Sequence, residues 1–213
     1  MTDSIQGLMV LADDSPCWKL DPVEQARAAC EGGASVVQLR AKRTTDRVVL
    51  QWAEAIRELT RKFDVDFFVN DRFDLALVSD ADGVHLGQDD FPPHRLPAHA
   101  RSRLKIGRST HTFEQATAAC AEPIDYIAFG PIFCTRSKSS VNESQGLDRL
   151  EEVVRHAHPR PVIAIGGIDL DNAAQVAATG AAGIAVISAI AKATDPPAAA
   201  RALGQILKSE PEP

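Results

Sequence analysis

Acidic and amide side chains follow two apolar runs that lie close together in the 213-residue sequence. Asn70 and Asp71 come after "DFFV", and Gln88, Asp89 and Asp90 come after "GVHLG". Carboxylates at neighbouring strand ends suit a hard cation such as Mg²⁺, which keeps several waters and bridges to phosphate oxygens. The same residue types are also ordinary helix caps. The spacing leaves both interpretations open and does not choose between Asp89 and Asp90.

Two cations, Arg40 and Lys42, stand at the end of another apolar run, "SVVQLR", which also contains Gln38. Because Ala41 separates them in an extended segment, both could project to one side and clamp a polyanion. Solvated surface charge is the commoner fate of such side chains, and taken alone the pair favours that interpretation.

Glycines and a hydroxyl close the last two apolar runs. Gly167 belongs to "AIGGID", and Ile187 and Ser188 belong to "AVISAI". In parallel barrels the loops after the seventh and eighth strands commonly form a phosphate site, where glycine lets backbone N–H groups approach the anion. A tight strand-to-helix turn would explain the glycines. It would not explain why they occur together with Ile187 and Ser188 at the end of the next strand.

The segment 130–146 is too long and too polar for a simple connection. Thr135, Ser137 and Lys138 supply two hydroxyls and an ammonium within four residues, so they could form an anion clamp. A solvated loop is the alternative.

Two histidines are candidates for a functional role. His111 follows Ser109 in "IGRSTHT" and could act as a general acid or base, although a lone histidine near a helix start is more often structural. His85 lies between Val84 and Leu86, where strand alternation turns it inward while its neighbours pack outward.

The elements that must position these residues alternate regularly between short apolar runs and amphipathic helical stretches. Eight strands are predicted, at 7–12, 35–40, 66–70, 83–87, 104–109, 125–130, 161–167 and 182–188. Nearly continuous apolar strands separated by helices are typical of a parallel sheet that is covered on both faces. Eight such units favour a closed (β/α)8 TIM barrel of the α/β class, whose active site lies at the carboxyl ends of the strands.

Helix signals support this organisation. Asp21 and Pro22 begin a predicted helix over 21–33, and the longest helix is predicted over 44–63. The prolines of "DDFPPHRLPAHARSR" predict a short or irregular connection there. An open doubly wound sheet is a weaker alternative, because "LADDSPC" after the first strand contains no phosphate-binding glycine.

Composition excludes several classes of protein. Apolar residues make up 45% and charged residues 24%, which predicts a globular chain: a single barrel over 1–208 with a disordered tail over 209–213. The net charge of −6 argues against a nucleic-acid partner, and no apolar stretch is long enough for a membrane span. The four scattered cysteines predict neither a zinc site nor disulfides, which favours a cytoplasmic location. A homo-oligomer is left open.

Several segments together resemble the thiamine-phosphate synthase family. They are "VVQLRAK", "FFVNDRFDLAL", "DADGVHLGQDD", "IGRSTHT", "DYIAFGPIFCTRSK" and "PVIAIGGIDLDNAAQVAATGAAGIAVISAI", in this order. The resemblance spans nearly the whole chain. It implies a (β/α)8 barrel that joins hydroxymethylpyrimidine diphosphate to a thiazole phosphate, with Mg²⁺, and releases pyrophosphate through a dissociative substitution.

The resemblance also implies roles for individual residues. Asp71 and Asp90 would bind Mg²⁺, which selects Asp90 over Asp89. Arg40, Lys42 and Lys138 would stabilise the departing pyrophosphate as the catalytic cations. The remaining substrate-binding residues fall into two groups: Gln38, Asn70 and Ser109 on the pyrimidine diphosphate, and Thr135, Ser137, Gly167, Ile187 and Ser188 on the thiazole phosphate.

Some residues depart from the synthase pattern. Cys134 stands where proline is usual, Ser137 where threonine is usual, and Arg108 where a small aliphatic residue is common. Arg108 and "CTRSK" also resemble the sister family of thiazole tautomerases, which would use His111 as acid and base. That enzyme would not need Asn70, the two metal carboxylates and the two strand-end cations together, so the synthase is favoured. A non-catalytic barrel that binds thiamine precursors is the third hypothesis.

Overall fold

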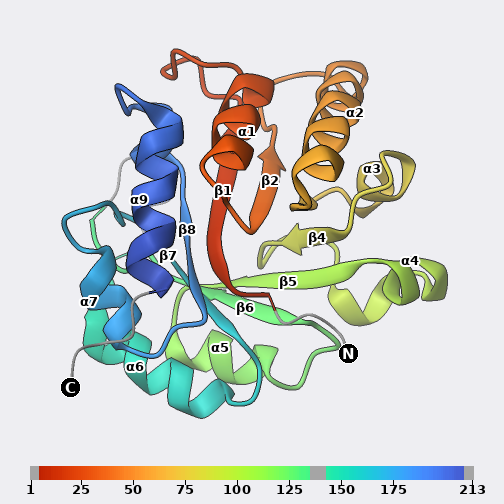
Figure 1. The fold of residues 1–213 in the computed structure, drawn as a ribbon. Coiled ribbons are helices and arrows are strands. Elements are labelled where there is room, and N and C mark those ends of the chain that lie inside the picture. Colours follow the sequence, from red (N-terminus) through yellow and green to blue (C-terminus); the bar gives the residue numbers. More distant parts are fainter. Residues whose placement is uncertain (1–4, 135–142, 209–213) are drawn as a thin grey trace.

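A computed structural model describes residues 5–134 and 143–208 of the chain. Over these ranges eight parallel strands form one closed barrel, in which each strand pairs with the next along the chain and the last pairs with the first (Figure 1). The strands are β1 (Gly7–Asp13), β2 (Val36–Arg40), β3 (Asp66–Asn70), β4 (Gly83–Leu86), β5 (Lys105–Thr110), β6 (Tyr126–Phe129), β7 (Val162–Ile165) and β8 (Gly183–Val186). The predicted (β/α)8 class is confirmed, and the open sheet is excluded.

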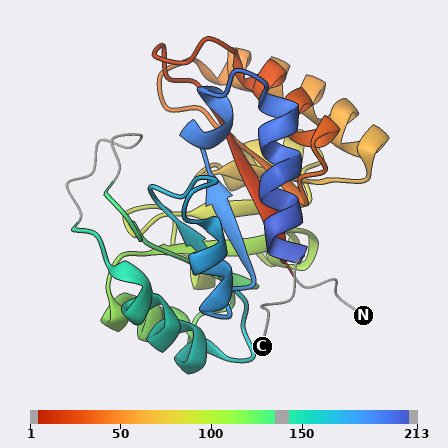
Figure 2. The same cartoon turned by 60° about the vertical axis from the view of Figure 1, so that its left-hand side comes forward.

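Helices follow the strands and surround the barrel. They are α1 (Pro22–Glu31), α2 (Asp46–Phe63), α3 (Phe73–Val78), the 3-10 helix η1 (Pro93–Arg95), α4 (Ala98–Arg103), α5 (Phe113–Ala119), α6 (Gly146–Ala157), α7 (Ala173–Ala178), α8 (Ser188–Ala191) and α9 (Pro196–Lys208). Figures 1 and 2 show α9 packed beside α1, and α9 also contacts β1, so this helix covers the barrel next to its first strand. Among the described helices, every one is too short or too polar to cross a bilayer.

Local sequence signals account for where the helices begin and end. The Asp21 side chain accepts a hydrogen bond from the Glu24 backbone N–H, and the Glu24 side chain accepts one from the Asp21 N–H, which completes a capping box at the start of α1. The proline-rich connection over 90–103 forms only η1 and the six-residue α4, as the prolines predict.

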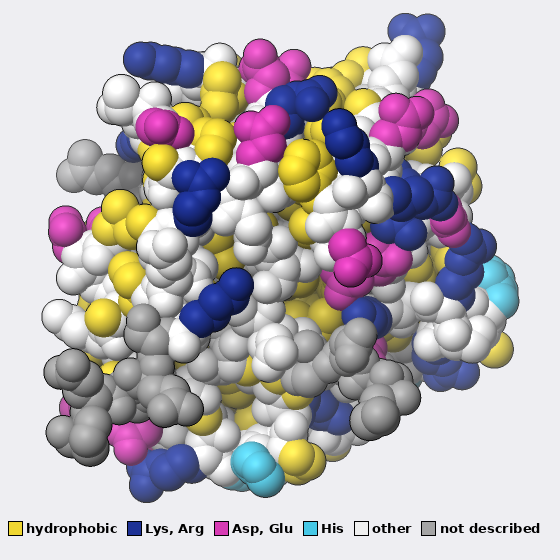
Figure 3. Space-filling view, viewed as in Figure 1, with side chains coloured by type: hydrophobic (Ala, Val, Ile, Leu, Met, Phe, Trp, Pro, Cys, Tyr) yellow, Lys and Arg dark blue, Asp and Glu magenta, His cyan; other side chains and the backbone are white. Residues whose placement is uncertain are grey.

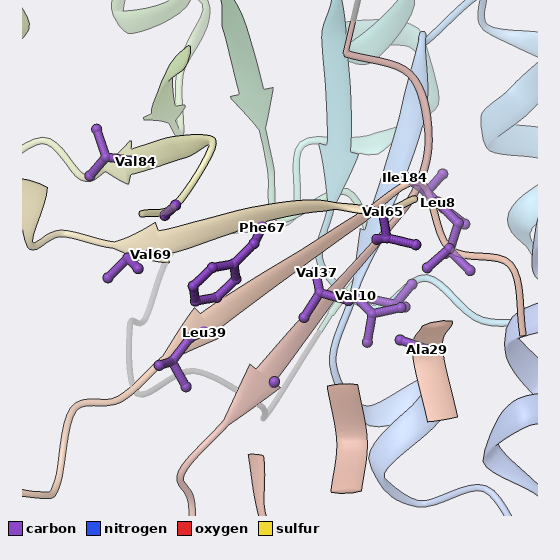
Figure 4. Packing of buried hydrophobic residues seen from close by; sticks show 14 of the residues in the cluster. Leu8, Val10, Ala29, Val37, Leu39, Val65, Phe67, Val69, Val84 and Ile184 are labelled. Carbon is purple, nitrogen blue, oxygen red and sulfur yellow. The ribbon is translucent and has the colours of Figure 1, made fainter. Parts of the chain in front are cut away.

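Strand alternation divides the apolar side chains into two sets. One set points outward against the helices; Figure 4 shows Val10, Val37 and Leu39 of this set on adjacent strands, with Ala29 of α1 nearby. The other set fills the barrel interior: Met9, Leu11, Val36, Phe68, Tyr126, Ala128, Ile163 and Ala185 all belong to it. Inward positions near the carboxyl ends of β1 to β5 are polar instead, namely Asp13, Gln38, Asn70, His85 and Ser109, which makes that end of the barrel the candidate site.

The last two strands each end two residues earlier than predicted. The seventh, predicted to residue 167, ends at Ile165 because Gly166 and Gly167 adopt φ values of 102° and 68°. The eighth, predicted to residue 188, ends at Val186 because α8 begins at Ser188. Both strands therefore stop where the phosphate-binding turns were expected to begin.

Candidate active site

Arg40 is held by a carboxylate that sequence reasoning missed. Asp13 ends β1 directly opposite Arg40 in the sheet register, and Arg40 Nη1 donates to Asp13 Oδ2 at 2.5 Å. The Asp13 side chain is fully buried and also accepts from Trp18 Nε1 at 2.7 Å. Arg40 therefore carries a buried, hydrogen-bonded counter-ion that orients its guanidinium at the barrel mouth. The sequence did contain a signal for this carboxylate, because an acidic residue directly follows the first predicted strand in "VLADD".

Lys42 turns away from Arg40 and pairs with Asp71 across the β2–β3 side of the mouth. The expected common projection of the two cations is thus only partly observed: both lie at this end of the barrel, but they contact acids on opposite neighbouring strands. Asp14 supports the turn between them, since its carboxylate accepts the backbone N–H groups of Lys42 and Arg43.

Asp71 and Asp90 are brought together at the ends of β3 and β4. Burial raises the pKa of Asp71, contact with the Asp90 carboxyl raises it further, and Lys42 opposes the shift. Asp71 has φ 64°, a left-handed conformation that Asp tolerates, and its N–H donates to the His85 carbonyl at 2.7 Å. Asp90 Oδ2 accepts the Gly87 N–H at 2.6 Å, whereas Asp89 is exposed.

The Asp71–Asp90 pair is a candidate for holding a divalent cation. Two partly buried carboxylates in contact repel each other, and a divalent cation between them would relieve that repulsion. In the described ranges no group of three or more His, Cys, Asp or Glu side chains could hold a metal. Mg²⁺ is commonly held by one or two protein carboxylates, with substrate phosphates and water completing its shell, so Asp71 and Asp90 could hold this ion only together with such ligands.

A pocket of about 330 Å³ opens beside these acids. Its polar lining includes Lys42, Asn70, Asp71 and Asp90, and its apolar lining comes from strand and helix residues such as Val69 and Leu75. Four predicted site residues thus face one cavity. On the face of the molecule seen in Figure 3, basic and acidic side chains are intermixed, and this face has no broad basic area.

Gln38 lies deeper in the barrel, where its side chain is buried. Its Nε2 contacts Met9 Sδ at 3.5 Å, and its Oε1 has no hydrogen-bond partner among the described residues. A buried amide oxygen without a donor is costly, so this atom is a ready acceptor for a ligand N–H.

Ser109 lies near the end of β5, and its hydroxyl is hydrogen-bonded to His85. Ser109 Oγ lies 2.8 Å from His85 Nε2, and the Ser109 carbonyl accepts from Gln88 Nε2 at 2.6 Å. His85 points into the barrel, as strand alternation predicted, and its Nδ1 lies 2.8 Å from the Tyr126 hydroxyl. The participation of Tyr126 was missed, because it lies 41 residues from His85 in the chain.

Gly166 and Gly167 make room for the first residues of the loop after β6. A Cβ at Gly166 would lie 2.5 Å from Pro131, and one at Gly167 would lie 2.8 Å from the Cys134 carbonyl oxygen. The N–H groups of Ile132 and Phe133 donate to the carbonyls of Ile165 and Gly166. These glycines therefore have a packing role in addition to any contact with a phosphate.

The other predicted cradle residues follow β8, beside these glycines. Ile165 pairs with Ala185 in the β7–β8 register, so Gly167 and Ile187 stand two residues beyond a matched pair. Ile187 is buried and directly precedes α8, which begins at Ser188. The structure thus brings Gly167, Ile187 and Ser188 to one side of the mouth, whereas Thr135, Ser137 and Lys138 lie outside the described residues.

Arg108 and His111, both left without a clear role by the sequence, contact backbone carbonyls. Arg108 Nη1 donates to the Gly87 carbonyl at 2.6 Å, and Arg108 Nε lies 3.3 Å from Glu122 Oε2. Arg108 therefore stabilises the turn that contains Gly87 and Asp90. His111 Nδ1 lies 2.6 Å from the Gly130 carbonyl, to which it must donate, because a carbonyl only accepts.

The closed parallel barrel, with charged side chains gathered at its carboxyl end, has the architecture of the (β/α)8 enzymes. A model of the thiamine monophosphate synthase family matches residues 8–190. The thiamine-phosphate synthase of Anaeromyxobacter dehalogenans is 49% identical over 180 residues, which cover 84% of this chain and 80% of that protein. The synthase of Chlorobium phaeovibrioides is 46% identical over 196 residues, covering 92% and 91%.

A solved structure agrees with these relatives. Thiamine phosphate pyrophosphorylase from Pyrococcus furiosus superposes with a TM-score of 0.85 at 39% identity, covering 95% of this chain and 96% of that one. The chain belongs to the thiamine monophosphate synthase family. Its activity is that of a thiamine-phosphate synthase, a transferase of thiamine biosynthesis, and the tautomerase and non-catalytic alternatives are not favoured.

Proposed function

We propose that the barrel condenses hydroxymethylpyrimidine diphosphate with thiazole phosphate at its carboxyl end, with Mg²⁺ held by Asp71 and Asp90. The observation that carries the proposal is the contact of these two carboxylates beside Lys42, next to a pocket that Asn70 also lines. When bound, the ion would neutralise charge on the diphosphate oxygens.

The first step would break the bond between the pyrimidine methylene carbon and the diphosphate oxygen. Negative charge then accumulates on the departing pyrophosphate, where Arg40 and Lys42 supply positive charge. Lys138 is proposed as a third cation on the resemblance alone. Because Asp13 is buried beneath Arg40, that guanidinium is already oriented before the substrate arrives.

The pyrimidine cation left by this step would be captured by the thiazole nitrogen, which forms the new carbon–nitrogen bond. Gln38 and Ser109 would hold the pyrimidine, and the unpartnered Gln38 Oε1 suits its amino group. Gly167, Ile187 and Ser188, together with Thr135 and Ser137, would hold the thiazole phosphate. No protein nucleophile is required, and the four cysteines are unpaired thiols. We further propose that the enzyme works in the cytoplasm, where such thiols stay reduced.

The direct test incubates the purified protein with both phosphorylated substrates, with and without Mg²⁺, and follows thiamine phosphate and pyrophosphate together. Equal amounts of both products, formed only with the metal, are expected. Product formation that is indifferent to Mg²⁺ and to chelation would remove the metal from the proposal. Isomerisation of a thiazole carboxylate phosphate in place of condensation would establish the tautomerase instead.

A further inference from the structure

Three polar side chains form a hydrogen-bonded chain through the interior of the barrel. The Tyr126 hydroxyl lies 2.8 Å from His85 Nδ1, and His85 Nε2 lies 2.8 Å from Ser109 Oγ. The three residues come from β6, β4 and β5, and the first two are buried. The chain therefore runs from the apolar core to the end of β5, where Ser109 is the candidate contact with the pyrimidine.

The position of the tyrosine is set by what surrounds it. A Cβ at Gly107, on the strand between β4 and β6, would collide with the Tyr126 ring. On another side, the Phe68 ring packs edge-on with its centroid 5.9 Å away. The absence of a side chain at Gly107 and the presence of Phe68 thus hold the phenol where its hydroxyl meets His85 Nδ1.

The direction of the hydrogen bonds follows from this burial. Among the described residues, the His85 ring is the hydrogen-bond partner that the structure gives to the Tyr126 hydroxyl. If that hydroxyl accepted from Nδ1–H, its own proton would face an apolar core, which is costly. Burial raises the pKa of Tyr126, so the phenol keeps its proton and can donate it to Nδ1.

A neutral imidazole that accepts at one nitrogen carries its proton on the other. His85 Nε2–H then donates to Ser109 Oγ, which leaves the Ser109 hydroxyl proton for a partner in the site. With the opposite tautomer, Ser109 would give its proton to His85 and offer the site only lone pairs.

We propose that Tyr126 and His85 are positioning residues that turn Ser109 into a hydrogen-bond donor toward a ring nitrogen of the pyrimidine. The inference rests on the proposed contact between Ser109 and that substrate. The histidine tautomer, however, is a property of the free protein and can be measured without it.

The first experiment determines that tautomer by nitrogen-15 NMR of the uniformly labelled full chain, at a pH well above the ordinary histidine pKa. The chain has six histidines, and the resonances lost in His85→Gln identify the ring of interest. A protonated Nε2 and an unprotonated Nδ1 are expected. A proton on Nδ1 overturns the proposal whatever the enzyme's activity.

The second experiment compares kcat and KM of the Tyr126→Phe variant with those of the parent. Losing one oriented hydrogen bond should lower kcat about tenfold and leave the KM for the pyrimidine diphosphate within about twofold. Ser79→Ala is the matched control, because the buried Ser79 hydroxyl donates to the Leu75 carbonyl on α3. It should lower the melting temperature similarly and leave kcat unchanged. A kcat of Tyr126→Phe within about twofold of the parent would overturn the proposal.

Two further variants separate donation from packing. The Nε2 amide of His85→Gln can still donate to Ser109, whereas His85→Met has similar length and no donor. Higher turnover in the glutamine variant is expected, and equal turnover in both counts against a donated hydrogen bond. Ser109→Ala tests the substrate contact itself: full activity there with an Nε2-protonated His85 would reject the proposed pyrimidine contact, while the orientation of the chain would stand.

Discussion

Arg40 Nη1 donates to Asp13 Oδ2 at 2.5 Å, and the Asp13 side chain has no exposed surface. Asp13→Asn should therefore loosen the guanidinium that is proposed to stabilise pyrophosphate. A charge-assisted hydrogen bond contributes about 1.5–3 kcal/mol, so kcat/KM should fall roughly tenfold to a hundredfold.

Steady-state kinetics at saturating thiazole phosphate measures this effect. Asp80→Asn is a suitable control, because Asp80 also pairs with arginines but follows α3, away from the strand ends that carry the site. Equal kinetics for Asp13→Asn and the parent would mean that Arg40 does not need its buried counter-ion.

Substitution of the three acids after β3 and β4 should have different effects on the stabilisation of the protein by Mg²⁺. The melting temperature of the parent protein should rise with Mg²⁺, because a ligand that binds only the folded state stabilises it. Asp71→Asn should abolish the rise while keeping the left-handed backbone, which Asn tolerates as Asp does. Asp90→Asn should do the same, whereas the exposed Asp89 should be replaceable by Asn without effect.

Differential scanning fluorimetry with a Mg²⁺ titration measures these melting temperatures without substrates. Without metal, Asp90→Asn should also melt higher than the parent, because it removes one of two like charges in contact. A Mg²⁺ response that persists in both ligand variants would place the ion elsewhere.

Arg108 should stabilise the turn that holds Asp90. Arg108→Ile removes the donor to the Gly87 carbonyl and the partner of Glu122, so the free energy of unfolding should fall by about 2–4 kcal/mol. Glu122→Gln in the same chain should restore part of the loss, because it removes the unpaired carboxylate. Urea denaturation of the single and double variants gives the comparison, and a single variant as stable as the parent would show that Arg108 is replaceable there.

His111 should not act as an acid or base. Its Nδ1 donates to the Gly130 carbonyl, and the side-chain amide of His111→Asn can reproduce that donor. Turnover of the asparagine variant should stay within about fivefold of the parent, whereas His111→Leu should lose more, since the Gly130 carbonyl then loses its donor. Loss of about a thousandfold in the asparagine variant would assign His111 a proton-transfer role.

Much of the barrel was predictable because its rules are local. Apolar alternation, prolines and glycines mark strands and turns within a few residues, and parallel strands bring their carboxyl ends to one side. This is why the pocket contains Lys42, Asn70, Asp71 and Asp90, although their roles there remain predictions.

Partners that lie far apart in the chain were not predictable. Asp13 resembles an ordinary turn residue until the register sets it opposite Arg40, and Tyr126 resembles a core aromatic until the closed barrel brings it to His85. Their importance depends on three-dimensional pairing and burial, which no pattern within one strand encodes.

The loop after β6 is closed by hydrogen bonds at its base: the N–H groups of Gln145 and Gly146 donate to the carbonyls of Pro131 and Ile132. The N–H groups of Ile132 and Phe133 donate in turn to the carbonyls of Ile165 and Gly166 at the end of β7. The described residues on both sides of the segment are therefore tied to β7 by backbone groups alone, whichever side chains they carry.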